Sequence, residues 1–248
     1  MKFFTGIEAT IRRAANRFGL DVTRYRPQST ELGRLRAMLS HHQVDMVLDV
    51  GANAGQFANG IRRVGYSGQI ISYEPLAEPH ALLMEASKQD PAWHVAERVV
   101  VGRAPGVVEM KVAGNSVSSS VLPMLAMHSD AAPGSETVAT QSVSVQTLDS
   151  LALPLLGPDA RLFIKIDTQG YEDRVLDGAT ALLDRARGVQ LEVSLVPLYE
   201  GQATREALMS RMEAAGFSLW SIWPGFFDPT SGRLLQFDAT FFREPGTR

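Results

Sequence analysis

Asp49-Val50-Gly51-Ala52-Asn53-Ala54-Gly55 is the stretch that decides the fold of this 248-residue chain. It follows an apolar, β-prone run and precedes residues 55–64, whose spacing predicts a helix. Glycines in a strand-to-helix turn let the backbone bend tightly and approach a ligand, and asparagine tolerates a positive φ better than other residues. Because ligands of open α/β sheets bind beyond the carboxyl ends of the strands, the stretch predicts a ligand site. The alternative is a tight turn that binds nothing.

Strands and helices alternate on either side of this stretch. The alternation predicts a parallel sheet covered on both faces, and the last two strands are expected to pair as an antiparallel hairpin. Residues 113–140, rich in Gly, Ser, Ala and Pro, are expected to form a long substrate-side loop. The expected helices are 55–64, 77–88, 171–185 and 204–215, and the expected strands are 46–50, 69–73, 95–101, 107–112, 142–145, 162–166, 189–195, 217–223 and 236–242.

The N-terminal part of the chain differs in charge from the rest. Residues 1–40 contain eight Lys or Arg against three acids, although the whole chain has a net charge of −3. Residues 3–18 have helical spacing, and Thr30 is a suitable N-cap for a second helix over about 30–41. We expect the first helix to pack on the domain or on the second subunit of a homodimer, although a basic amphipathic helix can also lie on a membrane surface. We therefore divide the chain into a helical extension, 1–42, and a domain, 43–248.

Composition excludes several classes of function. The chain has no cysteine, so disulfides, Cys-ligated metal centres and thiol catalysis are excluded. Its charge and a pI near 6.0 give no reason to expect a nucleic-acid partner. Because no run of 18 apolar residues and no secretory signal is found, a cytoplasmic location is expected.

Two further signals lie at strand ends. Glu74 ends the second strand, 23 residues after Gly51, and a carboxylate there can accept hydrogen bonds from both ribose hydroxyls of an adenosine-type ligand or of NAD. Lys165 and Asp167 lie at the end of the apolar strand 162–166, and Glu192 lies near the end of the next. Asp167 can act as a base, or Asp167 and Glu192 can bind a divalent cation such as Mg²⁺ through oxygens. The alternative is an ion pair of Lys165 that only fixes the sheet edge.

The combination of these motifs resembles the FkbM-type methyltransferases, a branch of the class I S-adenosylmethionine-dependent enzymes. The resemblance spans about residues 45–243 and leaves out residues 1–40. The matching pieces are Asp49–Gly55, Tyr73-Glu74-Pro75, Val101-Gly102, Ser118–Ser120, Leu148-Asp149, Lys165–Gly170 with Glu172, Glu192 and Gly216-Phe217.

The resemblance implies a Rossmann-like α/β fold with a seven-stranded, mostly parallel sheet in the order 3-2-1-4-5-7-6. It implies that the turn 49–53 lines the methionine end of S-adenosylmethionine, that Glu74 holds the ribose and that Gly102 lies near the adenine. Residues 118–120 and 167–169 would face the methyl group and the acceptor. The expected cofactor contacts are Asp49, Gly51, Asn53, Gly55, Glu74, Gly102 and Ser119.

The resemblance also implies O-methylation, often of a sugar hydroxyl, which is a poor nucleophile until it loses its proton. Asp167 and His128 are the candidate bases, with Lys165 beside the first, and imidazole titrates near neutrality. We expect a saccharide acceptor on a polysaccharide or glycolipid precursor. The alternatives are a nicotinamide-dependent oxidoreductase, which the glycine spacing disfavours, and a non-catalytic cofactor-binding module. The candidate acceptor contacts are Gln169, Tyr199 and Trp223.

Overall fold

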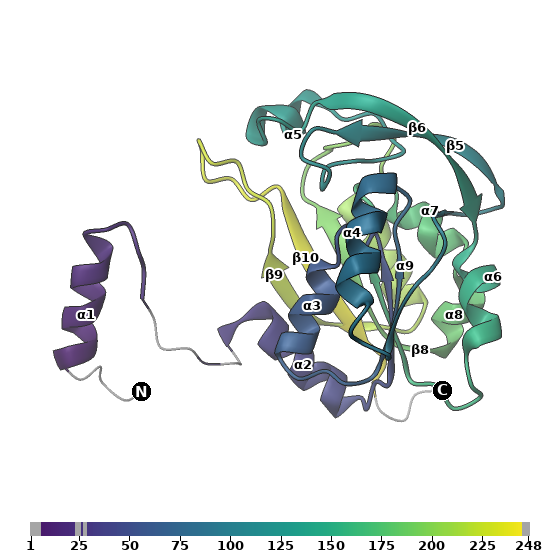
Figure 1. Ribbon diagram of the computed structural model, residues 1–248, viewed down its shortest axis with the longest axis horizontal. Helices are drawn as coiled ribbons and strands as arrows, with labels where there is room; N and C mark the ends of the chain where they lie inside the picture. Colours follow the sequence, from purple (N-terminus) through teal and green to yellow (C-terminus); the bar gives the residue numbers. More distant parts are fainter. Residues whose placement is uncertain (1–5, 23–25, 27–28, 245–248) are drawn as a thin grey trace.

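The computed structural model describes residues 6–22, 26 and 29–244 (Figure 1). A seven-stranded sheet lies at its centre, in the order β3-β2-β1-β7-β8-β10-β9. Numbered along the chain, these strands give the expected order 3-2-1-4-5-7-6, and only β10 runs antiparallel to its neighbours. The strands are β1 Met46–Val50, β2 Gln69–Tyr73, β3 Trp93–Val95, β7 Leu162–Ile166, β8 Ala186–Ser194, β9 Ser218–Pro224 and β10 Gln236–Phe242.

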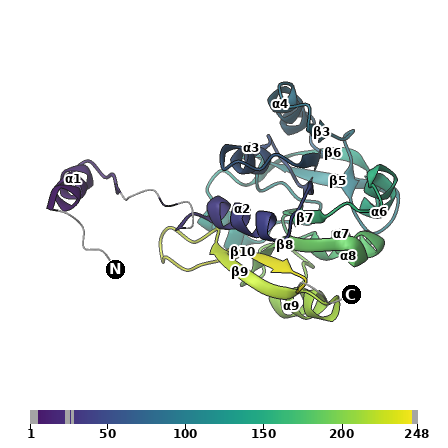
Figure 2. The same ribbon diagram turned by 90° about the horizontal axis from the view of Figure 1, so that it is seen from below.

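Helices cover both faces of this sheet (Figure 2). The alternation of β1 divides the core: Leu48 and Val50 face one apolar cluster, whereas Val47 faces the other. Asp49 therefore lies on the same face as Val47. That face is covered by α2 Glu31–His41, α3 Gln56–Arg63 and α4 Ala77–Ser87, and the opposite face by α6 Leu148–Ala152, α7 Glu172–Asp177, α8 Thr180–Arg185 and α9 Arg205–Ala214.

A second, three-stranded sheet, which the sequence did not predict, lies over one end of the first (Figure 1). It contains β4 Val100–Val101, β6 Thr137–Gln146 and β5 Gly106–Ala113, in that order. The expected strand 95–101 is wrong, because its two ends belong to different sheets. The expected loop 113–140 is also wrong in part, since it contains the helix α5, Ala126–Ala131, and the beginning of β6.

The expected helix 171–185 is divided into α7 and α8. Gly178 lies at the break, where a Cβ would come within 2.0 Å of the carbonyl oxygen of Gly102. The close approach of the two backbones explains why the helix does not continue. A short 3₁₀ helix, Leu153–Leu155, follows α6.

The two N-terminal helices differ in their surroundings. The helix α1, Gly6–Asn16, stands apart from the sheets in both views, and Ile11 and Phe18 are exposed (Figures 1 and 2). The structure thus does not show the expected packing of this helix on the domain. In contrast, α2 buries Leu35 and Leu39 in the core, and Thr30 caps it by accepting a hydrogen bond from Gly33 N at 3.2 Å. No helix within residues 6–22 or 29–244 is long and apolar enough to cross a membrane.

Candidate functional site

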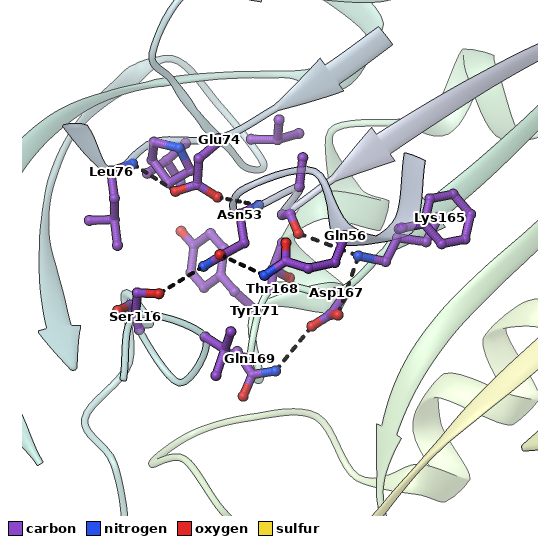
Figure 3. A pocket seen from close by; sticks show the side chains of 18 of the residues that line it. Asn53, Gln56, Glu74, Leu76, Ser116, Lys165, Asp167, Thr168, Gln169 and Tyr171 are labelled. Atoms are coloured by element: carbon purple, nitrogen blue, oxygen red, sulfur yellow. Dashed lines mark hydrogen bonds and ion pairs between the residues drawn. The ribbon is translucent and has the colours of Figure 1, made fainter. Parts of the chain in front are cut away.

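A cavity of about 320 Å³ lies at the carboxyl ends of β1, β2 and β7, beneath the small sheet (Figure 3). Its walls are the turn after β1, residues 74–76 after β2, the small sheet with the loop that follows β5, and residues 165–169. The cavity therefore lies where the sequence predicted a ligand site.

The turn after β1 brings two strand ends into contact. Gly51 has φ +79°, and a Cβ there would lie 1.8 Å from the carbonyl oxygen of Asp167, so only glycine fits. Asn53 has φ +46°, and its backbone N–H points to Glu74. Gly55 has φ +86° and packs against the ring of Trp93, where a Cβ would approach within 2.7 Å. Gly51 and Asn53 line the cavity, but Gly55 does not.

Glu74 is held by backbone donors on both of its oxygens. Asn53 N donates to Oε2 and Leu76 N donates to Oε1, each at 2.8 Å. Burial raises the pKa of Glu74 to about 7, although both of these hydrogen bonds oppose the rise. The carboxyl group lines the cavity, and each oxygen keeps acceptor capacity for a ligand hydroxyl.

Beside Glu74 the cavity wall is apolar. Gly102, expected at the adenine, does not line the cavity, because it packs beneath the Tyr171 ring at a position where a Cβ would lie 3.3 Å from that ring. Ser119 does line it, with its Oγ accepting a hydrogen bond from Ala113 N at 2.9 Å. The apolar wall consists of Leu76, Val100, Val101, Met110, Val121 and the ring of Tyr171.

A row of polar side chains crosses the sheet toward the other end of the cavity. Asp49, Lys165 and Gln190 are direct neighbours on β1, β7 and β8, so their side chains share one face. Lys165 Nζ lies 3.5 Å from Asp49 Oδ1 and 3.3 Å from Asp167 Oδ2. Burial alone would lower the pKa of Lys165, but attraction by Asp167 and Asp49 outweighs it and raises the pKa. Asp49 is fully buried and does not line the cavity, so it holds Lys165 instead of lying in the cofactor wall as expected.

Gln169 links the other polar groups of the site. Its Nε2 donates to Asp167 Oδ1 at 3.0 Å and to Glu192 Oε2 at 2.7 Å, and its Oε1 accepts from Tyr199 Oη at 2.8 Å. Gln169 and Asp167 line the cavity, whereas Tyr199, which is buried, and Glu192, which is half-buried, do not. Burial and the charge of Asp167 raise the pKa of Glu192 well above its ordinary value.

The amide of Gln169 therefore lies between the two carboxylates that were expected to share a metal. In the described part of the chain, no group of three or more His, Asp or Glu residues is arranged to hold a metal ion. Tyr199, expected to contact the acceptor, instead orients Gln169.

Two further expected site residues also lie outside the cavity. His128 is on α5, 3% exposed, with Nε2 3.0 Å from Ser118 Oγ, and burial lowers its pKa to about 4. It is thus a buried, neutral imidazole that does not line the cavity. Trp223 is on β9, where the guanidinium carbon of Arg34 lies 5.2 Å from its ring centre.

Three residues that the sequence did not predict also line the cavity. They lie at its far end, which is the end toward β8 and β10. They are Glu31 on α2, Gln190 on β8 and Asp238 on β10. Gln190 and Asp238 each stand between two apolar residues of a strand, a signal that could have identified them. Glu31 had no such signal, because its helix lies outside the family resemblance.

Comparisons with known proteins give one family match. A family model described as the methyltransferase FkbM domain matches residues 49–219, more than half of the chain. No curated protein gave a match. Solved structures that match include a candidate RNA methyltransferase from Pyrococcus horikoshii. It has 12% identity and TM-score 0.46, covering 99% of this chain and 100% of that one. The methyltransferase domain of bacterial CtHen1 has 14% identity and TM-score 0.46, covering 88% and 100%. TehB from Haemophilus influenzae has 8% identity and TM-score 0.45, covering 86% and 62%.

Proposed function

Because this chain belongs to the methyltransferase FkbM family and is an S-adenosylmethionine-dependent methyltransferase, we propose that it transfers the methyl group to a hydroxyl of a saccharide. Family membership argues against the nicotinamide oxidoreductase that the strand-end carboxylate also allowed. The main observation in support of the proposal is that the carboxyl groups of Glu74 and Asp167 line the same cavity.

The cavity wall fits S-adenosylmethionine. Glu74 offers two fixed oxygens to the ribose hydroxyls, and the apolar wall beginning at Leu76 suits the adenine ring. The turn 51–53 approaches closely enough to contact the amino-acid portion. When bound, the cofactor supplies a methyl group already activated by the positive charge of its sulfonium.

Each of the residues around Asp167 then has a distinct role in the transfer. Asp167 accepts the proton of the acceptor hydroxyl, and the amide of Gln169 fixes its Oδ1. Lys165 is buried, and its Nζ forms an ion pair with Asp167 Oδ2 at 3.3 Å, which fixes the position of that carboxylate. Holding the two reactants in line supplies the rest of the rate acceleration, and the apolar side chains that the small sheet contributes to the cavity wall limit the access of water.

The saccharide assignment is supported by the chemistry of the far end of the cavity. Glu31, Gln190 and Asp238 present carboxylates and an amide to the cavity instead of an apolar surface. Such groups suit an acceptor with several hydrogen-bond donors, as a sugar ring has.

The test is transfer of label from methyl-labelled S-adenosylmethionine into fractionated saccharide, lipid and protein pools. We expect label in saccharide or lipid-linked saccharide, and markedly less with Glu74→Ala at the same sub-saturating cofactor concentration. Label only in protein would overturn the saccharide assignment. Cofactor binding without any transfer would favour a non-catalytic binding module.

A further inference from the structure

The far end of the cavity is built partly from residues outside the family match. Glu31 precedes residues 49–219 and Asp238 follows them, whereas the residues beside the proposed cofactor all lie within that range. The family-wide part of the chain thus supplies the cofactor end, and parts beyond it shape the acceptor end. Selectivity for the acceptor is expected to reside in those additional parts.

Gln190 fixes the hydrogen-bonding character of this end. Its Nε2 donates to Glu31 Oε1 at 3.2 Å, and its side chain lies close enough to Asp238 to lower the pKa of that carboxyl group, against the larger effect of burial. Its nitrogen is engaged by Glu31, whereas its Oε1 has no hydrogen-bond partner in the described part of the chain. Gln190 is 3% exposed, so bulk solvent has little access to this acceptor, which lies in the cavity wall. A buried acceptor without a donor destabilises the site until a ligand supplies one.

The charged groups at this end of the cavity are mainly carboxylates. Among the described residues that line the cavity, the only cation is Lys165, which Asp49 and Asp167 already pair. Burial raises the pKa of Glu31, and burial with repulsion from Asp167 and Glu31 raises the pKa of Asp238 to about 7. Both carboxyl groups therefore lack a counter-charge of their own.

We infer that Glu31, Gln190 and Asp238 form an acceptor subsite for a protonated amine, and that the saccharide methylated by this protein is an amino sugar. The inference rests on the proposed function, because methyl transfer requires the acceptor at this end of the cavity. An ammonium group has three N–H donors and no acceptor, and the subsite offers two carboxylates and one carbonyl oxygen. An ammonium favours the ionised form of both carboxyl groups, whose pKa values are raised in its absence, whereas a neutral hydroxyl does not and a uronic acid would be repelled.

The test is calorimetric binding of matched sugars to the full chain saturated with S-adenosylhomocysteine. Glucosamine and galactosamine are compared with glucose, galactose and N-acetylglucosamine at a pH where the amines are protonated. We expect the amino sugars to bind about ten-fold tighter or more than their neutral partners. Asp238→Asn and Glu31→Gln should each remove most of that preference, whereas Asp159→Asn, an exposed control, should keep it.

Equal binding of aminated and neutral sugars, or no binding of either, would overturn the inference. So would a preference that survives in both Asp238→Asn and Glu31→Gln. The affinity for S-adenosylhomocysteine is measured first in the same samples. Its absence would count against the proposed function alone, and the amine preference would then be measured on the unliganded protein.

Discussion

The backbone N–H of Asn53 donates a 2.8 Å hydrogen bond to Oε2 of Glu74, although the two residues are 21 positions apart. The bond connects the turn after β1 to the end of β2, whose last residues, Val50 and Tyr73, are paired. Leu76 N fixes the second carboxyl oxygen. The carboxyl group is thus oriented before any ligand arrives, which reduces the entropy lost on binding.

We predict that Glu74→Ala weakens binding of S-adenosylhomocysteine by about 1–3 kcal/mol, because the ribose hydroxyls lose a charged acceptor. Titration calorimetry measures the change directly. Glu109→Ala removes an exposed carboxylate on β5 and serves as the control, with unchanged affinity expected. An affinity that Glu74→Ala leaves intact would place the ribose elsewhere.

Stability should fall as pH rises toward neutrality. Burial raises the pKa values of Glu74, Glu172 and Asp238 to about 7, from 4.5 for the glutamates and 3.8 for the aspartate. Between about pH 4.5 and 7, the folded protein therefore holds more protons than the unfolded chain, so raising the pH favours unfolding. We expect the free energy of unfolding, measured by urea denaturation of the unliganded protein, to decrease across this window.

Glu74→Gln should flatten this dependence, because one of the three titrating groups is gone. Glu109→Gln should leave it unchanged. A free energy of unfolding that stays level or rises between pH 5 and 7 would contradict the argument.

Two glycines with similar backbone angles allow a separate test of the turn after β1. Gly51 and Gly201 have φ +79° and +71°, but a Cβ at Gly201 meets no atom within 4 Å. Gly201→Ala should cost about 1–2 kcal/mol, the penalty of a left-handed conformation. Gly51→Ala adds a collision with the carbonyl oxygen of Asp167, so we expect a larger loss of stability and loss of S-adenosylhomocysteine binding. Equal effects in thermal unfolding and calorimetry would mean that the close approach is unimportant.

Asp167→Asn keeps the shape of the side chain but removes its basicity. We expect turnover to fall by about 10²–10⁴-fold, the usual contribution of a general base, with a much smaller change in cofactor affinity. Steady-state rates on the purified acceptor, together with calorimetry, separate the two effects. Asp159→Asn is the exposed control. If turnover and cofactor affinity fell in parallel, Asp167 would have a structural role through Lys165.

The main sheet could be predicted because its strands are short apolar runs bounded by turn residues, as in β1 and β7. The small sheet could not. The pattern of residues 95–101 predicts one strand. In the structure β3 ends at Val95 and pairs with β2, whereas β4 begins at Val100 and pairs with β6. These tertiary pairings divide the segment between two sheets. Periodicity carries no information about which partner a strand takes.

The candidate site was also predictable only in part. Gly51, Asn53, Glu74 and Asp167 follow from motifs at strand ends, and the cavity brings them together. His128 was misjudged because a histidine in a polar segment gives no sign that α5 buries it. The far end was missed because it joins residues from distant elements, α2, β8 and β10, and only the folded sheet makes them neighbours.

Tyr199→Phe tests whether the network behind the cavity positions Asp167. Tyr199 Oη lies 2.8 Å from Gln169 Oε1 and 3.0 Å from the carbonyl oxygen of Ser118, and Tyr199 does not line the cavity. Without the hydroxyl, Gln169 loses the partner that orients its amide toward Asp167. We expect kcat to fall about ten-fold with KM and cofactor affinity nearly unchanged, and the free energy of unfolding to fall by about 1–3 kcal/mol.

Tyr66→Phe is the matched control, because Tyr66 is also buried and its hydroxyl makes a single long hydrogen bond, to Gln69 O at 3.4 Å. Tyr66 does not line the cavity, so Tyr66→Phe should leave kcat unchanged. A rise in KM with unchanged kcat in Tyr199→Phe would instead support the direct acceptor contact that the sequence predicted, because removal of uniform binding raises KM alone. That result would require Tyr199 to become accessible when the acceptor binds.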